Sequence, residues 1–245
     1  MRVIPSITTT KRDHQLKLEE AKKLGLEEVC FYATGLLTEA RKDFYKLLEA
    51  SNIRKLPLVH LRSDMELWEL DFLTEKFGTE VFNCHSPKEY PLQYDLSKYK
   101  NRIYVENTVP VLTPEDIRDY AGVCLDVAHL ENDRILRKDV YEQNLEVIKS
   151  HKIGCCHVSG IGKKKLYDSA QKIEHYDLHF ISKYSELDYL TDYKEYLPEI
   201  VSLEMENSLE EQLKAKAYIE KILNQKRKPL VSLDFLFKKK DTLGN

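Results

Sequence analysis

The sequence predicts an α/β fold, a single (β/α)8 TIM barrel with parallel strands. Its 245 residues come close to the roughly 250 that are typical of this architecture. Eight short apolar runs alternate with longer amphipathic runs, a pattern that is typical of a parallel sheet covered by helices. Several of the short runs are apolar throughout, as expected for strands that are buried on both faces.

We expect one strand in each of the eight short runs, which are rich in β-branched and apolar residues. These runs are Arg2–Ile7, Glu28–Ala33, Leu56–Leu61, Glu80–His85, Arg102–Asn107, Gly122–Ala128, Ile153–Ser159 and Ile200–Glu206. Because eight units of one strand and one helix fit into a chain of this length, the pattern favours a closed barrel over an open sheet.

Helical periodicity fills most of the gaps between these strands. The expected helices are His14–Leu24, Thr38–Ala50, Glu66–Phe77, Thr113–Tyr120, Asp139–His151 and Ser208–Leu223. Thr38 is a candidate N-cap, and Ser208 with Glu211 has the spacing of a capping box. Residues 160–198 are expected to form a loop and one helix around Tyr184–Tyr196. The barrel domain is expected to occupy residues 1–237, and the lysine-rich residues 238–245 are expected to be a flexible tail.

The composition narrows the functional classes. With 38 basic and 41 acidic residues, the net charge of −3 gives no global attraction to nucleic acid or to an anionic membrane. No apolar run approaches the roughly 20 residues of a membrane span. The five cysteines form no CxxC pair, so they indicate neither a disulfide framework nor a thiolate zinc site. We expect them to be buried and reduced, as in a cytoplasmic protein.

Ionisable residues follow the predicted strands at their carboxyl ends, from the third strand onward. They are His60, His85, Glu106, Asp126, His129, His157, Glu204 and Glu206. In a barrel these ends converge on one face, where active sites are built. Carboxylates and imidazoles that meet there need a compensating charge, which a divalent cation supplies; oxygen and nitrogen ligands suit zinc, manganese or magnesium. The pattern therefore predicts a metal site, with Glu204 as a ligand and Glu206 beside it as a substrate-binding residue.

Four short motifs give the chain a resemblance to a known family. They are VENT at 105–108, GVCLDVAH at 122–129, HVSG at 157–160 and SLEMEN at 202–207. In their order and spacing the chain resembles the xylose isomerase-like TIM barrels, from the third strand to the last helix. That superfamily includes sugar phosphate isomerases and epimerases, and also the endonuclease IV type of apurinic endonuclease (AP endonuclease family 2).

The isomerase branch of this resemblance implies one shared metal site. Its ligands would be Glu106, Asp126, His157 and Glu204. Glu106 and Glu204 would move a proton as general base and acid while the metal stabilises an enediolate of a sugar or sugar phosphate. His129 would contact the substrate, and Lys163 stands where some epimerases place a substrate-binding arginine. Residues 163–165 can equally be read as a phosphate-binding segment or as a solvated basic loop.

The nuclease branch implies up to three metal ions and a larger ligand set. His60 and His85 would join Glu106, and His129 would pair with Asp177 and His179. The long interval between His157 and Asp177, and Val109–Pro110 in place of a glycine-rich run after the Glu-Asn-Thr motif, depart from that branch. We therefore expect an isomerase or epimerase that uses one to three divalent ions (zinc, manganese or magnesium). The alternatives are a multinuclear zinc phosphoester hydrolase acting on nucleic acid and a barrel that binds without turnover.

Overall fold

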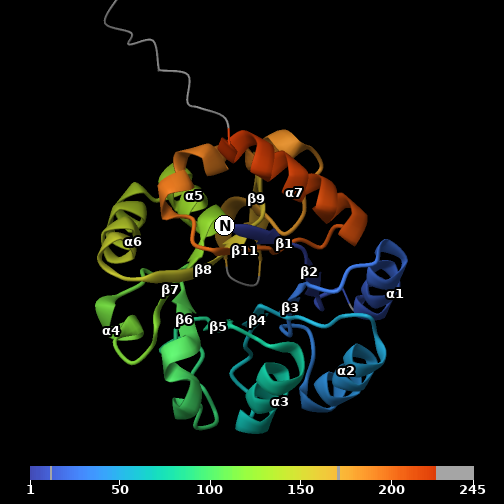
Figure 1. Ribbon diagram of the computed structural model, residues 1–245. Helices are drawn as coiled ribbons and strands as arrows, with labels where there is room; N and C mark the ends of the chain where they lie inside the picture. Colours follow the sequence, from blue (N-terminus) through green and yellow to red (C-terminus); the bar gives the residue numbers. More distant parts are fainter. Residues whose placement is uncertain (12, 170–171, 225–245) are drawn as a thin grey trace, which may run out of the picture.

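The computed structural model describes residues 1–11, 13–169 and 172–224. Its main sheet is entirely parallel and closes into a barrel inside a ring of helices (Figure 1). The first strand is divided at Pro5, which has no amide hydrogen to donate, into β1 (Arg2–Ile4) and β2 (Ser6–Thr8). β1 pairs with β11 (Ile200–Leu203) and β2 pairs with β3 (Cys30–Tyr32), so the two halves join the ends of the sheet. The barrel thus has eight strand positions, as predicted.

The remaining barrel strands follow in chain order, each hydrogen-bonded to its predecessor. They are β4 (Leu58–His60), β5 (Val81–Cys84), β6 (Ile103–Glu106), β7 (Gly122–Asp126) and β8 (Ile153–Val158). All eight predicted strand positions are confirmed, with ends that differ by a few residues. The fold class predicted from the sequence is correct.

Most helices lie where the sequence predicts them. They are α1 (His14–Leu24), α2 (Thr38–Ala50), α3 (Leu67–Phe77), the short α4 (Pro114–Ile117), α6 (Lys138–Ser150) and α7 (Leu209–Asn224). The 3-10 helix η1 (Ser97–Arg102) was not predicted. The capping box of Ser208 and Glu211 is confirmed, since Glu211 N lies 3.2 Å from Ser208 Oγ. The expectation that Thr38 caps α2 is wrong, because Leu37 occupies the N-cap position without a side-chain cap.

Two segments differ from the sequence-based expectation. The chain turns into α5 (Val127–Leu136) directly after β7, because the Asp126 carboxylate accepts a hydrogen bond from His129 N at 2.7 Å and caps the helix. Residues 160–178, expected to be a loop, form the antiparallel hairpin of β9 (Gly160–Asp168) and β10 (Ile173–Leu178). The helix expected around Tyr184–Tyr196 is present as two 3-10 helices, η2 (Tyr184–Asp192) and η3 (Lys194–Tyr196).

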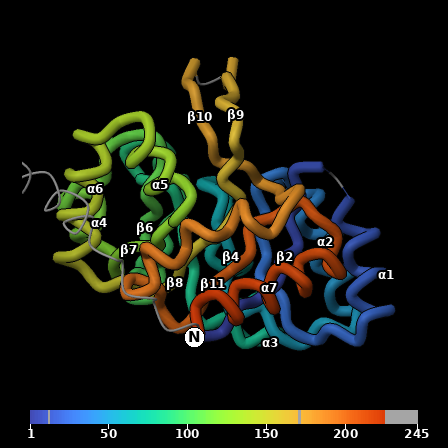
Figure 2. The backbone as a smooth tube through the Cα atoms, turned by 90° about the horizontal axis from the view of Figure 1, so that it is seen from above, coloured from blue at the N-terminus to red at the C-terminus, as the bar shows by residue number. Residues whose placement is uncertain are grey.

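The β9–β10 hairpin stands out from one end of the barrel, opposite the N-terminus (Figure 2). It follows β8, so it rises from the carboxyl ends of the strands. Two-stranded ribbons of this kind expose both faces, and here Lys163, Lys164 and Tyr167 are all exposed. The part of the hairpin nearer the barrel, by contrast, contacts the middle of α5, where Tyr176 N donates to Asn132 Oδ1 at 2.8 Å.

Apolar side chains fill the barrel on both sides of its strands. One cluster lies between strands and helices, and a smaller cluster fills the interior, consisting of Ile4, Cys30, Tyr32, Leu58, Tyr104, Cys124, Cys155 and Ile200. Gly154 on β8 is required by this packing, since a Cβ there would lie 2.1 Å from the ring of Tyr104. All five cysteines are buried and free of disulfides, as expected.

Two further features of the chain are the absence of a membrane-spanning helix among the described residues and the C-terminal boundary of the barrel domain. Within the described ranges, no helix combines the length and apolar character needed to cross a bilayer. The domain boundary expected at residue 237 and the tail expected at residues 238–245 lie outside the described residues.

Candidate metal centre

A cavity of about 310 Å³ opens where the carboxyl ends of the barrel strands converge. Each strand delivers its polar residue to this face because parallel strands run in the same direction. His60 ends β4, Glu106 ends β6 and Asp126 ends β7, while His157 is the last but one residue of β8 and Glu204 directly follows β11. The strands thus place these five residues at the same end of the barrel, as expected from the sequence.

Four of the predicted residues form one compact group, hereafter the four-residue centre. It consists of Glu106, Asp126, His157 and Glu204, whose nearest ligand atoms all lie within 4.8 Å of one another. His157 Nδ1 lies 3.2 Å from Glu204 Oε2, 3.4 Å from Glu106 Oε2 and 4.0 Å from Asp126 Oδ2. Two ligands that bind zinc at about 2 Å are separated by distances of this order. The geometry therefore suits a single shared cation.

The electrostatics of the four-residue centre also call for a cation. His157 is fully buried, and neither of its ring nitrogens has a hydrogen-bond partner in the described part of the chain. Three carboxylates surround this one imidazole. Burying several like charges without compensation is costly, and a buried polar atom without a partner is costly too. A divalent ion would satisfy both demands, so the donor set fits a metal.

The pKa values of the four-residue centre are shifted by the closeness of its charged groups and by their burial. Burial disfavours the charged imidazolium of His157, but Glu106 and Glu204 outweigh it and raise the pKa of His157 well above its usual value. Burial raises the pKa of Asp126 to about 6, partly offset by the neighbouring His129. Burial opposes ionisation of Glu204 as well, yet His179 and His157 lower its pKa to about 2. Without a metal ion, protons bound to His157 and Asp126 therefore offset part of the negative charge that a cation would offset.

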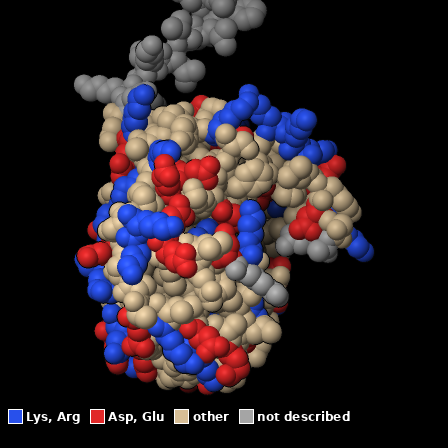
Figure 3. All heavy atoms as spheres, turned by 90° about the vertical axis from the view of Figure 1, so that its right-hand side faces the viewer, with Lys and Arg blue, Asp and Glu red and all other residues tan. Residues whose placement is uncertain are grey.

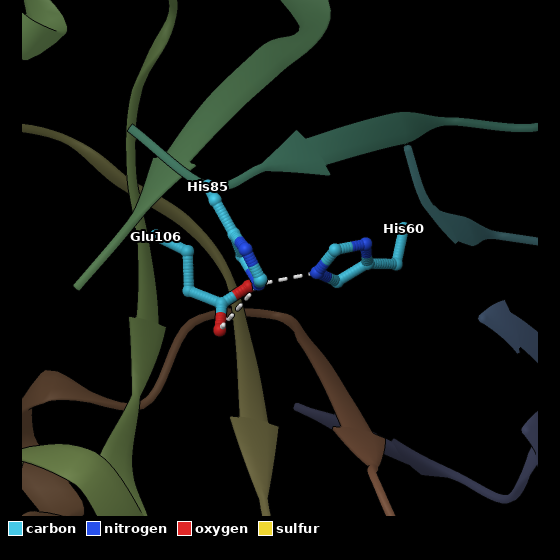
Figure 4. Close-up of side chains that lie close together, drawn as sticks. All are labelled: His60, His85 and Glu106. Carbon is cyan, nitrogen blue, oxygen red and sulfur yellow. Dashed lines mark ion pairs between the residues drawn. The ribbon is translucent and has the colours of Figure 1, made fainter. Parts of the chain in front are cut away.

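A second group of ligand-type residues shares Glu106 with the first. It consists of His60, His85 and Glu106 and is hereafter the histidine pair group; its ligand atoms also lie within 4.8 Å of one another. Figure 4 shows both imidazoles directed toward the carboxylate. His60 Nε2 lies 3.2 Å from Glu106 Oε2, and His85 Nε2 lies 4.0 Å from Glu106 Oε1.

The tautomer of His60 indicates why a cation fits here too. His60 Nδ1 lies 2.9 Å from the carbonyl oxygen of Leu61, which can only accept, so Nδ1 carries the proton. In a neutral ring the lone pair of Nε2 then faces the carboxylate of Glu106, an unfavourable contact unless a positive charge lies between them. Burial lowers the pKa of His85 to about 4, so this imidazole is neutral at pH 7 and free to bind a metal.

The first turn of α5 brings His129 to the cavity, and the end of the hairpin brings Asp177 and His179. His129 Nδ1 lies 3.1 Å from Asp177 Oδ2, and its Nε2 lies 3.8 Å from Asp126 Oδ2. Burial opposes the charge on His129, but Asp126 and Asp177 raise its pKa well above the usual value. His179 Nδ1 lies 3.8 Å from Glu204 Oε1.

His129, Asp177 and His179 do not form a compact ligand group of their own. Among the described residues, three groups bring ligand atoms close enough for a metal: the two above and Glu106 with Cys124 and His157. None of them includes His129, Asp177 or His179. Burial raises the pKa of Cys124 well above the usual value, which disfavours the thiolate that a metal would need.

The two remaining predicted residues lie in different surroundings. Glu206 lines the cavity and is held by Lys11 Nζ at 2.8 Å and Thr10 Oγ1 at 2.9 Å. Lys163 is exposed on β9 and does not line the cavity. Its expected role in substrate binding therefore has no support from the position of the side chain in this conformation.

Sequence reasoning missed several residues of the site. Asn83, in β5, donates from Nδ2 to Glu106 Oε2 at 2.7 Å. Tyr90 and His175 line the cavity, the latter with Nδ1 at 3.3 Å from Asp177 Oδ1. A signal for Asn83 was present, because it lies two residues before His85 and so points to the same side of the strand.

Several solved structures resemble this chain in fold. No family model and no curated protein matches the sequence. A xylose isomerase-like TIM barrel protein from Mycobacterium smegmatis, in complex with magnesium, is similar in fold, with 13% identity, a TM-score of 0.41, and coverage of 85% of this chain and 87% of that one. The likeness is one of fold.

Two other solved structures show a likeness of the same degree. A probable 3-DHS dehydratase from Bacillus anthracis has 14% identity and a TM-score of 0.43 over 91% of this chain and 99% of that one. An N-acetylneuraminate lyase from Mycoplasma synoviae has 12% identity and a TM-score of 0.44 over 88% and 71%. These likenesses concern the fold and not the function of the site.

Proposed function

We propose that this protein is a metal-dependent hydrolase of phosphoesters that uses at least two neighbouring divalent cations. One observation carries the proposal: Glu106 belongs both to the four-residue centre and to the histidine pair group. A carboxylate has two oxygens and can bridge two cations, and paired cations of this kind are typical of enzymes that hydrolyse phosphoesters.

Each group of residues would hold one ion. Glu106, Asp126, His157 and Glu204 would bind the first, and His60 and His85 would bind the second together with Glu106. When bound, the cations would lower the pKa of a water molecule and offset negative charge on the phosphoryl oxygens. The donor sets of imidazole and carboxylate suit zinc or manganese.

The protein's own side chains would orient the reactants. Asn83 fixes one oxygen of Glu106, and Asp177 holds the positively charged ring of His129 at the cavity wall, where it favours an anionic substrate. Hydrolysis consumes one water: its oxygen forms a bond to phosphorus, the phosphorus–oxygen bond to the leaving group breaks, and the leaving alcohol gains a proton. The cavity walls would hold the ester so that the departing oxygen lies opposite the attacking one.

The proposal concerns a small phosphoester, although nucleic acid was the substrate expected for a hydrolase. A cavity of about 310 Å³ is of the size that holds a small molecule. On the side of the molecule that carries α1 and α2, lysines and arginines are intermingled with aspartates and glutamates (Figure 3). This side is not the end of the barrel where the cavity opens, so the choice of a small substrate rests on the size of the cavity and on the near-neutral net charge of −3.

The isomerase or epimerase expected from the sequence is the second candidate. The cavity favours it as well, because Glu106 and Glu204 both line a space that a single sugar or sugar phosphate would fill. In that reaction one ion would suffice, and the two carboxylates would move the proton. The number of ions per chain therefore separates the two candidates.

Metal content of purified, reconstituted protein tests the proposal. By mass spectrometry of the metal, we expect two ions or more per wild-type chain, loss of one in His85→Ala, and no loss in the control His151→Ala, whose imidazole lies outside the cavity. The wild type should also hydrolyse bis(4-nitrophenyl) phosphate. If His85→Ala keeps every ion while Asp126→Ala loses all of them, the hydrolase proposal fails and the isomerase gains.

A further inference from the structure

A second cavity, of about 260 Å³, adjoins the metal centre on the side of β4 and β5. It shares Thr34, His60, His85 and Tyr90 with the main cavity. The rings of His60, His85 and Tyr90 line both spaces, with the His85 centroid 4.9 Å from that of His60 and 5.3 Å from that of Tyr90. A substrate bound at the histidine pair group can therefore extend into the second cavity.

Arg62 lines the second cavity, and its guanidinium is ion-paired with Asp64. No carboxylate is among the described residues that line this cavity, whereas Arg62 is. The arginine begins the loop after β4, two residues beyond His60, and its side chain is about one quarter exposed, at 28%. It is therefore near the surface of the cavity and still partly shielded from bulk water, where charge-assisted bonds gain strength.

The guanidinium of Arg62 is fixed in place with one donor group left over. Its Nε donates to Asp64 Oδ1 at 3.0 Å, and its Nη1 donates to the carbonyl of Thr34. Asp64 is itself held by Arg41 Nη1 at 3.0 Å, so the anchor is rigid. Within the described part of the chain, Nη2 of Arg62 has no hydrogen-bond partner. A preorganised arginine with free donors is suited to bind an oxyanion.

We propose that the second cavity binds a further oxyanion of the substrate, a carboxylate or a phosphate, through Arg62. The inference rests on the proposed function, which places the phosphoryl group at the metal centre. It narrows the substrate class to phosphoesters whose leaving group carries a second anionic group. Leu61 and Leu92, which also line the cavity, would contact the short carbon chain that joins the two anions.

Binding of inert ligands to the metal-loaded protein tests the proposal without turnover. The ligands are ethylphosphonate, which has one anionic group, and 3-phosphonopropionate and ethane-1,2-bisphosphonate, which carry a carboxylate or a phosphonate as the second. By calorimetry, we expect at least one of the two longer ligands to bind wild-type protein about 10- to 100-fold more tightly than ethylphosphonate, the range for a charged hydrogen bond. Which of them gains more identifies the second group as carboxylate or phosphate.

Substitutions at Arg62 assign the gain to this side chain. Arg62→Gln should abolish the preference for the longer ligands and leave the affinity for ethylphosphonate within about twofold, while Arg62→Lys should retain part of the preference. Arg54→Gln is the matched control, since Arg54 bonds only backbone carbonyls of its own loop and lines neither cavity. Thermal melts followed by circular dichroism verify that each variant is folded.

The outcomes separate this inference from the proposed function. If neither longer ligand binds the wild type more tightly, or if Arg62→Gln weakens all three ligands equally, the second cavity is not an anion site and the inference is overturned. If the preference depends on Arg62 but the wild type does not hydrolyse bis(4-nitrophenyl) phosphate, the anion site stands and the proposed reaction fails.

Discussion

Asn83 donates a hydrogen bond from Nδ2 to Glu106 Oε2 over 2.7 Å, and both residues are buried. The same carboxylate oxygen lies 3.2 Å from His60 Nε2. The amide must present its NH2 group here, because its oxygen would repel the carboxylate. Since Asn83 and His85 point to the same side of β5, one strand supplies both a residue that orients the shared carboxylate and a candidate ligand beside it.

Removing this hydrogen bond should weaken metal binding. We expect Asn83→Ala to lower the affinity for the second ion by about 10- to 100-fold, the usual cost of losing a residue that orients a metal ligand. Competition with a chromogenic chelator measures the affinity, and Asn101→Ala, at an exposed position, is the control. Equal affinities in Asn83→Ala and the wild type would show that Glu106 needs no such support.

Metal binding should depend on pH. A ligand must lose its proton before it binds, and the raised pKa values of Asp126, at about 6, and of His157 mean that both hold protons to higher pH than usual. Affinity should therefore rise with pH through 6 and fall about tenfold per unit below it for each proton displaced.

Calorimetry in two buffers that differ in ionisation enthalpy measures the protons released at pH 7. We expect a release of at least a fraction of a proton from His157, with Asp126 adding to it as the pH falls toward 6. Binding without any proton release between pH 5.5 and 7 would contradict the shared site of His157 and Asp126.

The charge of Glu204 should be essential for turnover. Glu204→Gln keeps the volume of the side chain, so the fold should survive, but it removes a carboxylate 3.2 Å from His157. We expect hydrolysis of bis(4-nitrophenyl) phosphate to fall by at least about 100-fold because the first ion is bound less well. Glu199→Gln, at an exposed position, is the control. Activity like that of the wild type would remove Glu204 from the site.

A buried ion pair between α2 and α3 should matter for stability. Arg41 is fully buried, and its Nε lies 2.8 Å from Glu69 Oε2, which is fully buried as well. Arg41→Ala would leave Glu69 charged and unpaired, so we expect the free energy of unfolding to fall by about 3–5 kcal/mol. Lys42→Ala, at the neighbouring half-exposed position, should leave the urea midpoint unchanged. A small effect of Arg41→Ala would mean that water reaches Glu69.

The residues of the four-residue centre could be predicted because two simple regularities hold. Strands buried on both faces stand out as apolar runs, and parallel strands place their last residues on one face. Glu106 and Asp126 each end such a run, so their convergence followed from the fold class. Their binding of a metal stays a prediction that the measurements above test.

The hairpin could not be predicted because its strands have little to bury. β9 runs through Lys163 and Tyr167 with both faces toward solvent, so the alternation that marks a half-buried strand is missing. The positions of Asp177 and His175 beside the cavity therefore could not be predicted from the strand pattern, although the family resemblance made Asp177 a candidate. The start of α5 was hidden for the opposite reason: Val127 and Ala128 extend the apolar run of β7 into the first turn of the helix.

The closure of the barrel between β1 and β11 has a consequence for the order of folding. Arg2 pairs with Ile200 and Ser6 N donates to Gln212 Oε1 at 2.7 Å, so the seam of the barrel joins the first residues of the chain to some of the last described ones. During synthesis on a ribosome, β1 cannot pair with β11 until β11 has left the ribosome. Contacts this distant in sequence carry the largest loop-closure entropy, so this seam should form late and slowly.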